Sequence, residues 1–254
     1  MAIKEVFMNP TVKEVIFQIR FPNLFYIENK IGEIQTRIME KFPKSALLFR
    51  RKLLFADVGP EGKIEEIPSV EGQGKKIWRF NSDNNFQLNI LSDSLDITSS
   101  YHKTYNLGDG DKFRDIIKYV MDNFLAVVSL PIINRIGLRY VDECPVLEKT
   151  NSTFAKWYNT AFPLSRFSID NAIEMSFNTT LKRSEYCIRY VESLAKHKNK
   201  EEYKLVLDYD GYAVNIKSSE YLKTTDELHD LISNEYENTI KEPVYEYMRH
   251  KKEE

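Results

Sequence analysis

The chain has 254 residues, of which 42% are hydrophobic and 29% charged, and it carries 15 Tyr and 15 Phe. This apolar and aromatic content excludes an intrinsically disordered chain, and the length allows a core that buries roughly 70 to 75% of the unfolded surface. With 36 Lys and Arg against 38 Asp and Glu, the net charge of -2 argues against strong non-specific attraction to nucleic acid, although it permits a local basic patch.

The cysteines and histidines offer no pattern typical of a metal or disulfide site. Cys144 and Cys187 have neither CxxC spacing nor a nearby pair of histidines, and the four histidines are scattered without an i, i+4 pair. We therefore expect reduced thiols, no metal and no cofactor. No run reaches the roughly 18 apolar residues of a membrane span, and the N-terminus has no apolar signal segment. The sequence predicts a cytoplasmic protein without membrane contact.

The first half of the chain shows strand, helix, four strands and helix. Apolar residues alternate over 15–21 and predict a strand that ends at Pro22. Spacings of three and four predict a helix over 27–42. Four short runs separated by turn-prone segments predict an antiparallel meander: 46–58, 76–82, 85–92 and 94–101. A second helical pattern covers about 110–128.

After Leu130-Pro131 the same order begins again. The patterns predict a strand over 132–143, a short helix over 151–160, and strands near 172–181 and 184–194. Two further strands, 203–210 and 212–218, are predicted to turn at Asp210-Gly211, a dipeptide typical of hairpins. A helix over 225–248, with Thr225 as its N-cap, closes the chain.

This repetition predicts an α+β protein with a curved antiparallel sheet and two long helices on one face. Its duplicated β-α-β4-α halves, 1–130 and 131–254, would share one sheet and one core. Two matches support duplication, because Arg20 and Arg139 lie 119 residues apart and Phe113 and Leu228 lie 115 apart. Two halves that are similar by chance are the alternative, since any two amphipathic helices can be aligned.

Strand alternation divides the side chains between the two faces of the predicted sheet. Under the helices we expect Val15, Phe17, Ile19, Leu88, Ile90, Ile97, Ile136, Leu138, Met175, Phe177, Ile188, Leu205 and Leu207. On the opposite face we expect Gln18, Arg20, Arg79, Asn81, Gln87, Asn89, Thr98, Arg135, Arg139, Ser176, Asn178, Arg189 and Asn215. This polar face has few aromatic residues, which argues against stacking of unpaired bases.

The polar face is the leading candidate for a binding site. Guanidinium and amide groups bind phosphates, carboxylates and base edges, which makes five residues the candidate ligand contacts: Gln18, Arg20, Arg79, Arg135 and Arg139. A face that is simply solvated is the alternative, because antiparallel sheets commonly leave one side in water.

The carboxylates suggest a second candidate. Asp208 and Asp210 share one strand face and Asp142 ends another strand, which suggests a metal-dependent phosphodiesterase or nuclease. A hairpin explains Asp210-Gly211 without catalysis, and no further acidic or lysine motif completes a site. No GxSxG elbow is present and neither cysteine has a recognisable nucleophile context, so no catalytic residue is assigned.

The basic run Arg50-Arg51-Lys52 lies inside an apolar stretch. It needs an acidic neighbour or an anionic ligand, unless its residues are charges on an edge strand that prevent aggregation.

Three segments carry a family resemblance: 15–21, Trp78-Arg79-Phe80 and 135–140. Together they resemble an uncharacterised, sporadically distributed family of prokaryotic proteins of about this length. The resemblance implies no established activity and transfers no catalytic residue, although sporadic distribution is typical of mobile or genome-defence loci. The order of elements is also similar to the saddle of the TATA-box-binding protein and to other helix-grip folds, but the predicted polar face lacks the paired Phe wedges of that saddle.

These patterns favour a non-enzymatic binding or assembly module whose Arg- and Asn-rich face takes an anionic ligand, a nucleic acid or a partner protein. The nuclease that uses Asp208, Asp210 and Asp142 is one alternative. The other is a structural subunit that forms a homodimer or a hetero-oligomer through the exposed faces of the two long helices.

Overall fold

One open antiparallel sheet organises the structure, a computed structural model that describes residues 5–50, 75–196 and 202–250. Within these residues the strand order is β2-β3-β4-β5-β1-β6-β9-β8-β7. The strands are β1 (Val12–Arg20), β2 (Lys44–Arg50), β3 (Lys75–Asn81), β4 (Gln87–Ile90), β5 (Ser94–Ser99), β6 (Ile132–Val146), β7 (Met175–Arg183), β8 (Tyr186–Lys196) and β9 (Tyr203–Lys217). The predicted α+β class and antiparallel sheet are confirmed.

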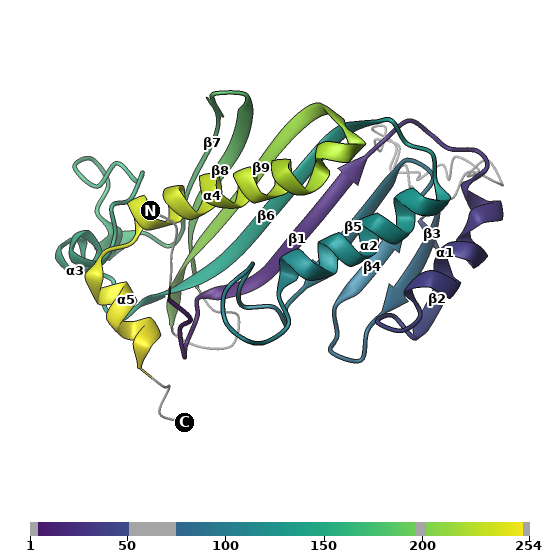
Figure 1. Cartoon of the computed structure of the whole chain (residues 1–254). Helices are drawn as coiled ribbons and strands as arrows, with labels where there is room; N and C mark the ends of the chain where they lie inside the picture. The colour runs from purple at the N-terminus through teal and green to yellow at the C-terminus, as the bar shows by residue number, and fades with distance from the viewer. Residues whose placement is uncertain (1–4, 51–74, 197–201, 251–254) are drawn as a thin grey trace, which may run out of the picture.

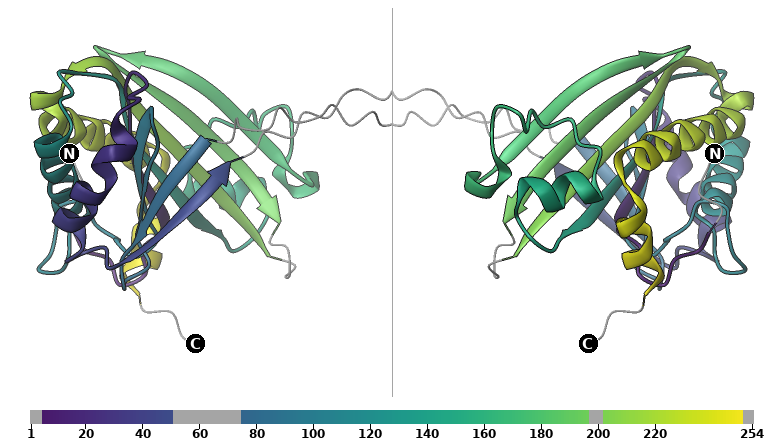
Figure 2. Two further views of the ribbon diagram at one scale, coloured as in Figure 1. Left: turned by 90° about the vertical axis from the view of Figure 1, so that its right-hand side faces the viewer. Right: turned by 90° about the vertical axis from the view of Figure 1, so that its left-hand side faces the viewer.

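The helices gather on one side of this sheet. They are α1 (Ile31–Ile38), α2 (Phe113–Val127), α3 (Asn151–Trp157), α4 (Tyr221–Thr239) and α5 (Glu242–Arg249), with 3-10 turns at Ile27–Lys30, Ile169–Asn171 and Ser218–Glu220. Figure 1 shows α2 and α4 lying across one face, and Figure 2 shows the twisted sheet from its two ends, with α1 on the same side. We call the opposite surface the helix-free face. None of the described helices is long and apolar enough to cross a membrane.

Strand alternation places the predicted core residues between the sheet and the helices. Phe17 of β1 lies opposite Ile97 of β5 and Leu138 of β6, and all three are fully buried. Most of the expected core is confirmed, because the structure also buries Val15, Ile19, Leu88, Ile90, Ile136, Ile188, Leu205 and Leu207. Met175 and Phe177 are only half-buried, since β7 is an edge strand.

The buried face of α2 follows directly from its sequence. Its buried residues recur at spacings of three and four and are Phe113, Ile116, Ile117, Val120, Met121 and Phe124. The other helix predicted in the first half is shorter than expected. The segment 27–42 consists of a 3-10 turn followed by the short α1, which ends at Ile38.

The hairpin predicted at Asp210-Gly211 is wrong. Strand β9 runs through both residues without a turn and pairs with β6 on one side and β8 on the other, so that Gly211 lies opposite both Leu138 and Ile188. The glycine serves helix packing instead. A Cβ atom on Gly211 would lie 3.2 Å from Cδ1 of Ile232, so its absence lets α4 approach the sheet closely.

The single helix predicted over 225–248 is also wrong. Helix α4 begins four residues earlier, at Tyr221, so Thr225 is not an N-cap; its hydroxyl donates to the Tyr221 carbonyl oxygen at 2.7 Å inside the helix. The helix ends where Ile240 becomes extended and bridges to Tyr158. Helix α5 then starts with Pro243 in its first turn, a position that proline favours.

The predicted repeat is not matched strand for strand. Four strands, β2 to β5, follow α1, whereas among the described residues three, β7 to β9, follow α3, because β9 takes the place of two predicted strands. Of the basic run Arg50-Arg51-Lys52, only Arg50 falls in a described strand, β2. The rest of that run, the remainder of the strand predicted over 46–58 and the turn after it lie outside the described residues.

A buried carboxylate holds the loop between α3 and β7. Glu192 of β8 is fully buried on the helix side, where its Oε1 accepts from the Tyr190 hydroxyl and its Oε2 accepts from the Thr160 hydroxyl at 2.5 Å. The Ala161 backbone N–H donates to both oxygens at 3.2 and 3.1 Å. Three donors therefore satisfy this charge in place of a basic partner.

Candidate functional site

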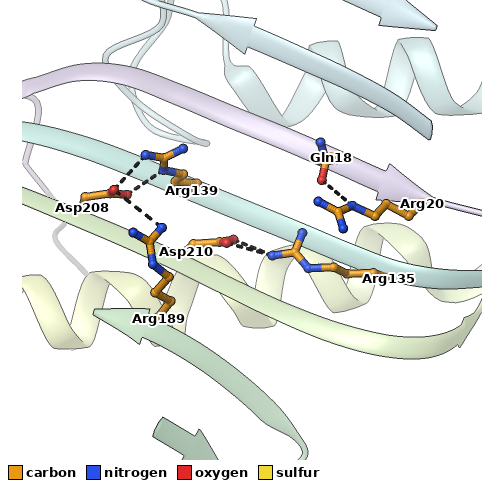
Figure 3. A network of polar contacts seen from close by, with 7 residues as sticks. All are labelled: Gln18, Arg20, Arg135, Arg139, Arg189, Asp208 and Asp210. Atoms are coloured by element: carbon orange, nitrogen blue, oxygen red, sulfur yellow. Dashed lines mark hydrogen bonds and ion pairs between the residues drawn. The ribbon is translucent and has the colours of Figure 1, made fainter. Parts of the chain in front are cut away.

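The helix-free face brings together most of the predicted binding residues. Gln18 and Arg20 come from β1, and Arg135 and Arg139 come from the neighbouring β6, where Arg20 lies opposite Arg135 and Gln18 lies opposite Gly137. Their side chains alternate with buried residues of the same strands, such as Ile19 and Leu138, so they point away from the helices. Figure 3 shows these side chains together with three from β8 and β9.

The first centre of this site is the carboxylate of Asp208 on β9. Arg139 donates to it in bidentate fashion, with Nε 2.6 Å from Oδ1 and Nη2 2.7 Å from Oδ2. Arg189 of β8 approaches the same carboxylate from the other side, with Nη1 4.0 Å from Oδ2 (Figure 3). The hydrogen bonds that Arg139 donates to Asp208 raise the pKa of Arg139 above its ordinary value, because the carboxylate stabilises the charged guanidinium. One carboxylate thus sits between two guanidinium groups.

The second centre is the carboxylate of Asp210, two residues further along β9. Arg135 donates through Nη2 to both oxygens of Asp210, at 2.9 and 2.8 Å. Its guanidinium also lies over the Tyr212 ring, with Cζ 4.6 Å from the ring centroid. Gly137 makes this position available, because a Cβ atom there would lie 2.5 Å from Nη1 of Arg135. The glycine in the middle of β6 therefore gives the arginine room to lie flat on the sheet.

Two arginines of the site are less fully neutralised. Arg20 is exposed and donates through Nε to the neutral amide oxygen of Gln18 at 3.0 Å. Arg189 is 41% exposed at its side chain and, within the part of the chain that the structure describes, reaches only a carboxylate that Arg139 already holds. These two guanidinium groups are the ones best placed to take a further anion.

We define the arginine network as the residues of Figure 3, namely Gln18, Arg20, Arg135, Arg139, Arg189, Asp208 and Asp210. Four guanidinium groups against two carboxylates leave the network with a net charge of +2. The Glu14 carboxylate of β1 lies near enough to Arg139 to interact with its charge, and so partly offsets the positive charge of the network. The network is a basic patch on a chain whose overall charge is -2.

Arg79 does not belong to this network. It lies on β3, which β4 and β5 separate from β1. Its Nε donates to the Asn89 amide oxygen at 2.9 Å, and the Asn89 amide in turn donates to Asp96 at 2.8 Å. Burial raises the pKa of Asp96, with the Asn89 hydrogen bond and the Arg79 charge acting in the opposite direction. The structure thus splits the five predicted contacts into a group of four and a separate Arg79 cluster.

The structure adds three residues to the predicted binding set: Arg189, Asp208 and Asp210. Alternation predicts Arg189 on the polar face and places both aspartates on one strand face. Their role as partners of the arginines depends on β9 lying between β6 and β8, which is a long-range pairing. No local spacing gives these pairs, because Arg139 lies opposite Asp210 but binds Asp208, and Arg135 lies opposite Val214 but binds Asp210.

The three carboxylates of the nuclease hypothesis do not meet. Asp208 and Asp210 lie on the helix-free face and bind arginines, whereas Asp142 is buried on the helix side and accepts a hydrogen bond from the Thr11 hydroxyl at 2.8 Å. Within the described parts of the chain no three His, Cys, Asp or Glu side chains are grouped as metal ligands. Nothing in this geometry favours two-metal chemistry at these residues.

Comparison of the chain with family models, with curated proteins and with solved structures gives no match.

Proposed function

We propose that this protein is a non-enzymatic binding module whose arginine network takes an acidic segment of a partner protein. The observation that carries the proposal is the state of Arg20 and Arg189. Among the described residues Arg20 bonds only the neutral amide of Gln18, and Arg189 stands 4.0 Å from a carboxylate that is already held in bidentate fashion. Both side chains therefore have guanidinium N–H donors for an incoming anion.

Carboxylates suit this surface better than nucleic acid. The network already binds two carboxylates of its own, Asp208 and Asp210, through the planar forks of neighbouring arginines, and a partner's Asp or Glu needs the same geometry. The aromatic ring of Tyr212 is covered by Arg135, so it offers no free platform for a base. The chain's slightly acidic overall charge also disfavours a long polyanion.

The test measures binding of a fluorescent oligoglutamate peptide, and of single- and double-stranded oligonucleotides of equal charge, at low ionic strength. The variant is Arg20→Ala with Arg189→Ala. The control is Arg37→Ala on α1, which removes a similarly exposed arginine (43% exposed, paired with Glu33 at 3.6 Å) on the helix side of the sheet.

Two exposed ion pairs of about 0.7 kcal/mol each predict that the double variant binds the peptide about tenfold more weakly. The control is expected to bind within twofold of the parent. Absence of peptide binding by the parent, or equal losses in the variant and the control, would contradict the proposal. Tighter binding of an oligonucleotide with the same dependence on Arg20 and Arg189 would assign the face to nucleic acid instead.

Arg139 is not suitable for this test. Its removal leaves Asp208, only 13% exposed at its side chain, without its bidentate partner, so loss of binding would be confounded with loss of stability.

The duplication of the two halves, 1–130 and 131–254, is part of the same proposal. In its support, β1 and β6 lie side by side at the centre of the sheet, and each is followed by a helix and then by antiparallel strands. After these strands a long helix, α2 or α4, crosses the same face in each half (Figure 1). A place in a genome-defence or mobile locus rests on the family resemblance alone.

A further inference from the structure

A second site lies on the other side of the sheet, at the end where the N-terminal segment meets α5. A cavity of about 120 Å³ opens there between residues 5–12, the loop 103–107, β6, α4 and α5. The N-terminal segment is held in place because the Asn9 backbone N–H donates to the Met248 carbonyl oxygen at 2.9 Å. For comparison, an apolar protein cavity of about 150 Å³ accommodates benzene. The present cavity is somewhat smaller but open to solvent, so it takes at most one small ring or a short chain.

Most of the cavity wall is apolar or aromatic. Phe7, Leu107 and Ile232 contribute apolar surface. Tyr105 and His229 form one aromatic wall, stacked with ring centroids 4.2 Å apart, and the Tyr140 hydroxyl lies 3.1 Å from Nδ1 of His229. An apolar ligand body is thus favoured over a strongly hydrated one.

The polar end of the cavity is the carboxylate of Asp142, which is only 6% exposed. The Thr11 hydroxyl donates to its Oδ1 at 2.8 Å, which uses the single proton of that hydroxyl. The Tyr236 hydroxyl, 2.6 Å from the Thr11 oxygen, must then be the donor of that bond. The Tyr236 proton thus points to the Thr11 oxygen and the Thr11 proton to Oδ1, and none of the described residues donates to Oδ2. Oδ2 is not sealed from solvent, so a ligand or a water molecule in the cavity can supply its donor.

The charges around Asp142 favour a neutral ligand. Lys13 and Lys103 both act on this carboxylate, and the Lys103 ammonium, which also lines the cavity, is fixed by the carbonyl oxygens of Ser100 at 2.7 Å and Val12 at 3.2 Å. A ligand ammonium would add a third positive charge beside Asp142. A ligand carboxylate would face Asp142 itself. A hydroxyl group supplies the missing donor without either repulsion.

We propose that this cavity binds a small neutral molecule, with an apolar body about the size of benzene and a hydroxyl group that donates a hydrogen bond to Oδ2 of Asp142. The site is independent of the arginine network, which lies on the opposite face of β6 and β9. The ionised form of Asp142 is the acceptor; burial raises its pKa to about 6, so this form predominates at pH 7 and above.

The experiment compares four ring compounds that differ only in their substituent: phenol, toluene, benzylamine and benzoate. Affinities are measured on the full chain by protein NMR titration at pH 7.5. We expect phenol to bind at least tenfold more tightly than toluene, and the charged compounds to bind more weakly than toluene. Equal binding of phenol and toluene, preference for a charged compound, or no binding of any of the four would overturn the proposal.

Two variants locate the site. Asp142→Asn keeps the size of the side chain and the acceptor for Thr11 but places an amide N–H₂ at the second position. Phenol then exchanges a hydrogen bond to a charged acceptor for a weaker one from a neutral donor, so its advantage over toluene should fall severalfold. Leu107→Trp fills the cavity and should abolish binding of both compounds. The matched control, Asp83→Asn, removes an exposed carboxylate that pairs with Lys44 and should leave phenol binding unchanged. The comparison of the four compounds on the unmodified protein can refute the proposal by itself. The test therefore does not depend on whether either variant folds.

Discussion

Replacing Asp208 by Asn removes one charge from the arginine network without changing the size of the side chain. Asn retains one acceptor oxygen for Arg139, so one of the two hydrogen bonds at 2.6 and 2.7 Å is lost. Hydrogen bonds to buried charges contribute about 1.5 to 3 kcal/mol and exposed pairs about 0 to 1. Asp208 is 13% and Arg139 is 38% exposed, which places this pair between the two cases. We expect the free energy of unfolding to fall by about 1 to 2 kcal/mol.

The same change should strengthen binding of an acidic peptide. The network charge rises from +2 to +3, and one additional charge about 5 Å from a partner carboxylate in water contributes about 0.8 kcal/mol, or a three- to fourfold gain in affinity. Denaturant unfolding and oligoglutamate titration at low salt give the two quantities. The control is Asp83→Asn, an equal change of charge at a residue that is 74% exposed beside Lys44, for which we expect neither effect. If Asp208→Asn weakened peptide binding, Asp208 would organise the arginines for the partner instead of competing with it, and the reasoning would be refuted.

Three further predictions concern stability. In Gly137→Ala the new Cβ atom displaces Arg135, so we expect the free energy of unfolding, measured with denaturant, to fall by about 1 kcal/mol. In a protein that already carries Arg135→Ala, the same glycine substitution should cause no further loss. Glu192→Ala leaves buried donors without an acceptor and should cost about 3 kcal/mol or more in the same assay, whereas a loss below 1 kcal/mol would show that the loop rearranges freely. Burial raises the pKa of Asp142 from 3.8 to about 6, so the folded parent binds the proton more tightly; unfolding at pH 4 and pH 7 should show it losing about 2 kcal/mol relative to Asp142→Asn as the pH rises.

Local patterns predicted the elements whose periodicity is set by a single buried face. Strand β1 alternates because only the face that lies under the helices is buried, and α2 shows an unbroken stripe from Phe113 to Phe124. In these elements the residues that specify the local conformation are also those that form the core, so local and long-range preferences agree.

The errors occur where a distant segment overrides a local signal. Asp210-Gly211 favours a turn, but partners on both sides keep β9 extended, and Gly211 is used for contact with α4. Likewise, the bridge between Ile240 and Tyr158 interrupts a helical pattern that looks continuous in sequence. Pro243 was the local sign of that break, because proline is tolerated in the first turn of a helix and not in its interior.

The sequence predicts on which face of the sheet the site residues lie, but not which arginine pairs with which aspartate. Alternation predicts Arg135 and Arg139 on the polar face, and it also predicts Asp208 and Asp210 on one side of their strand. Which arginine meets which aspartate depends on the register of β6 against β9, and a shift of two residues would preserve both faces while exchanging the partners. Periodicity contains no information about that register.

The alternation within β6 also limits how natural variants of this protein can change in length. Arg139 and Asp142 stand three residues apart on opposite faces of one strand, each serving a different surface. Inserting or deleting one residue in the first part of β6 would turn every later side chain to the other face, sending a guanidinium into the core and a carboxylate out to the arginines. Among natural relatives we therefore expect β6 to keep a constant length, and insertions to collect in connections such as the one between α3 and β7, where no side chain has to alternate.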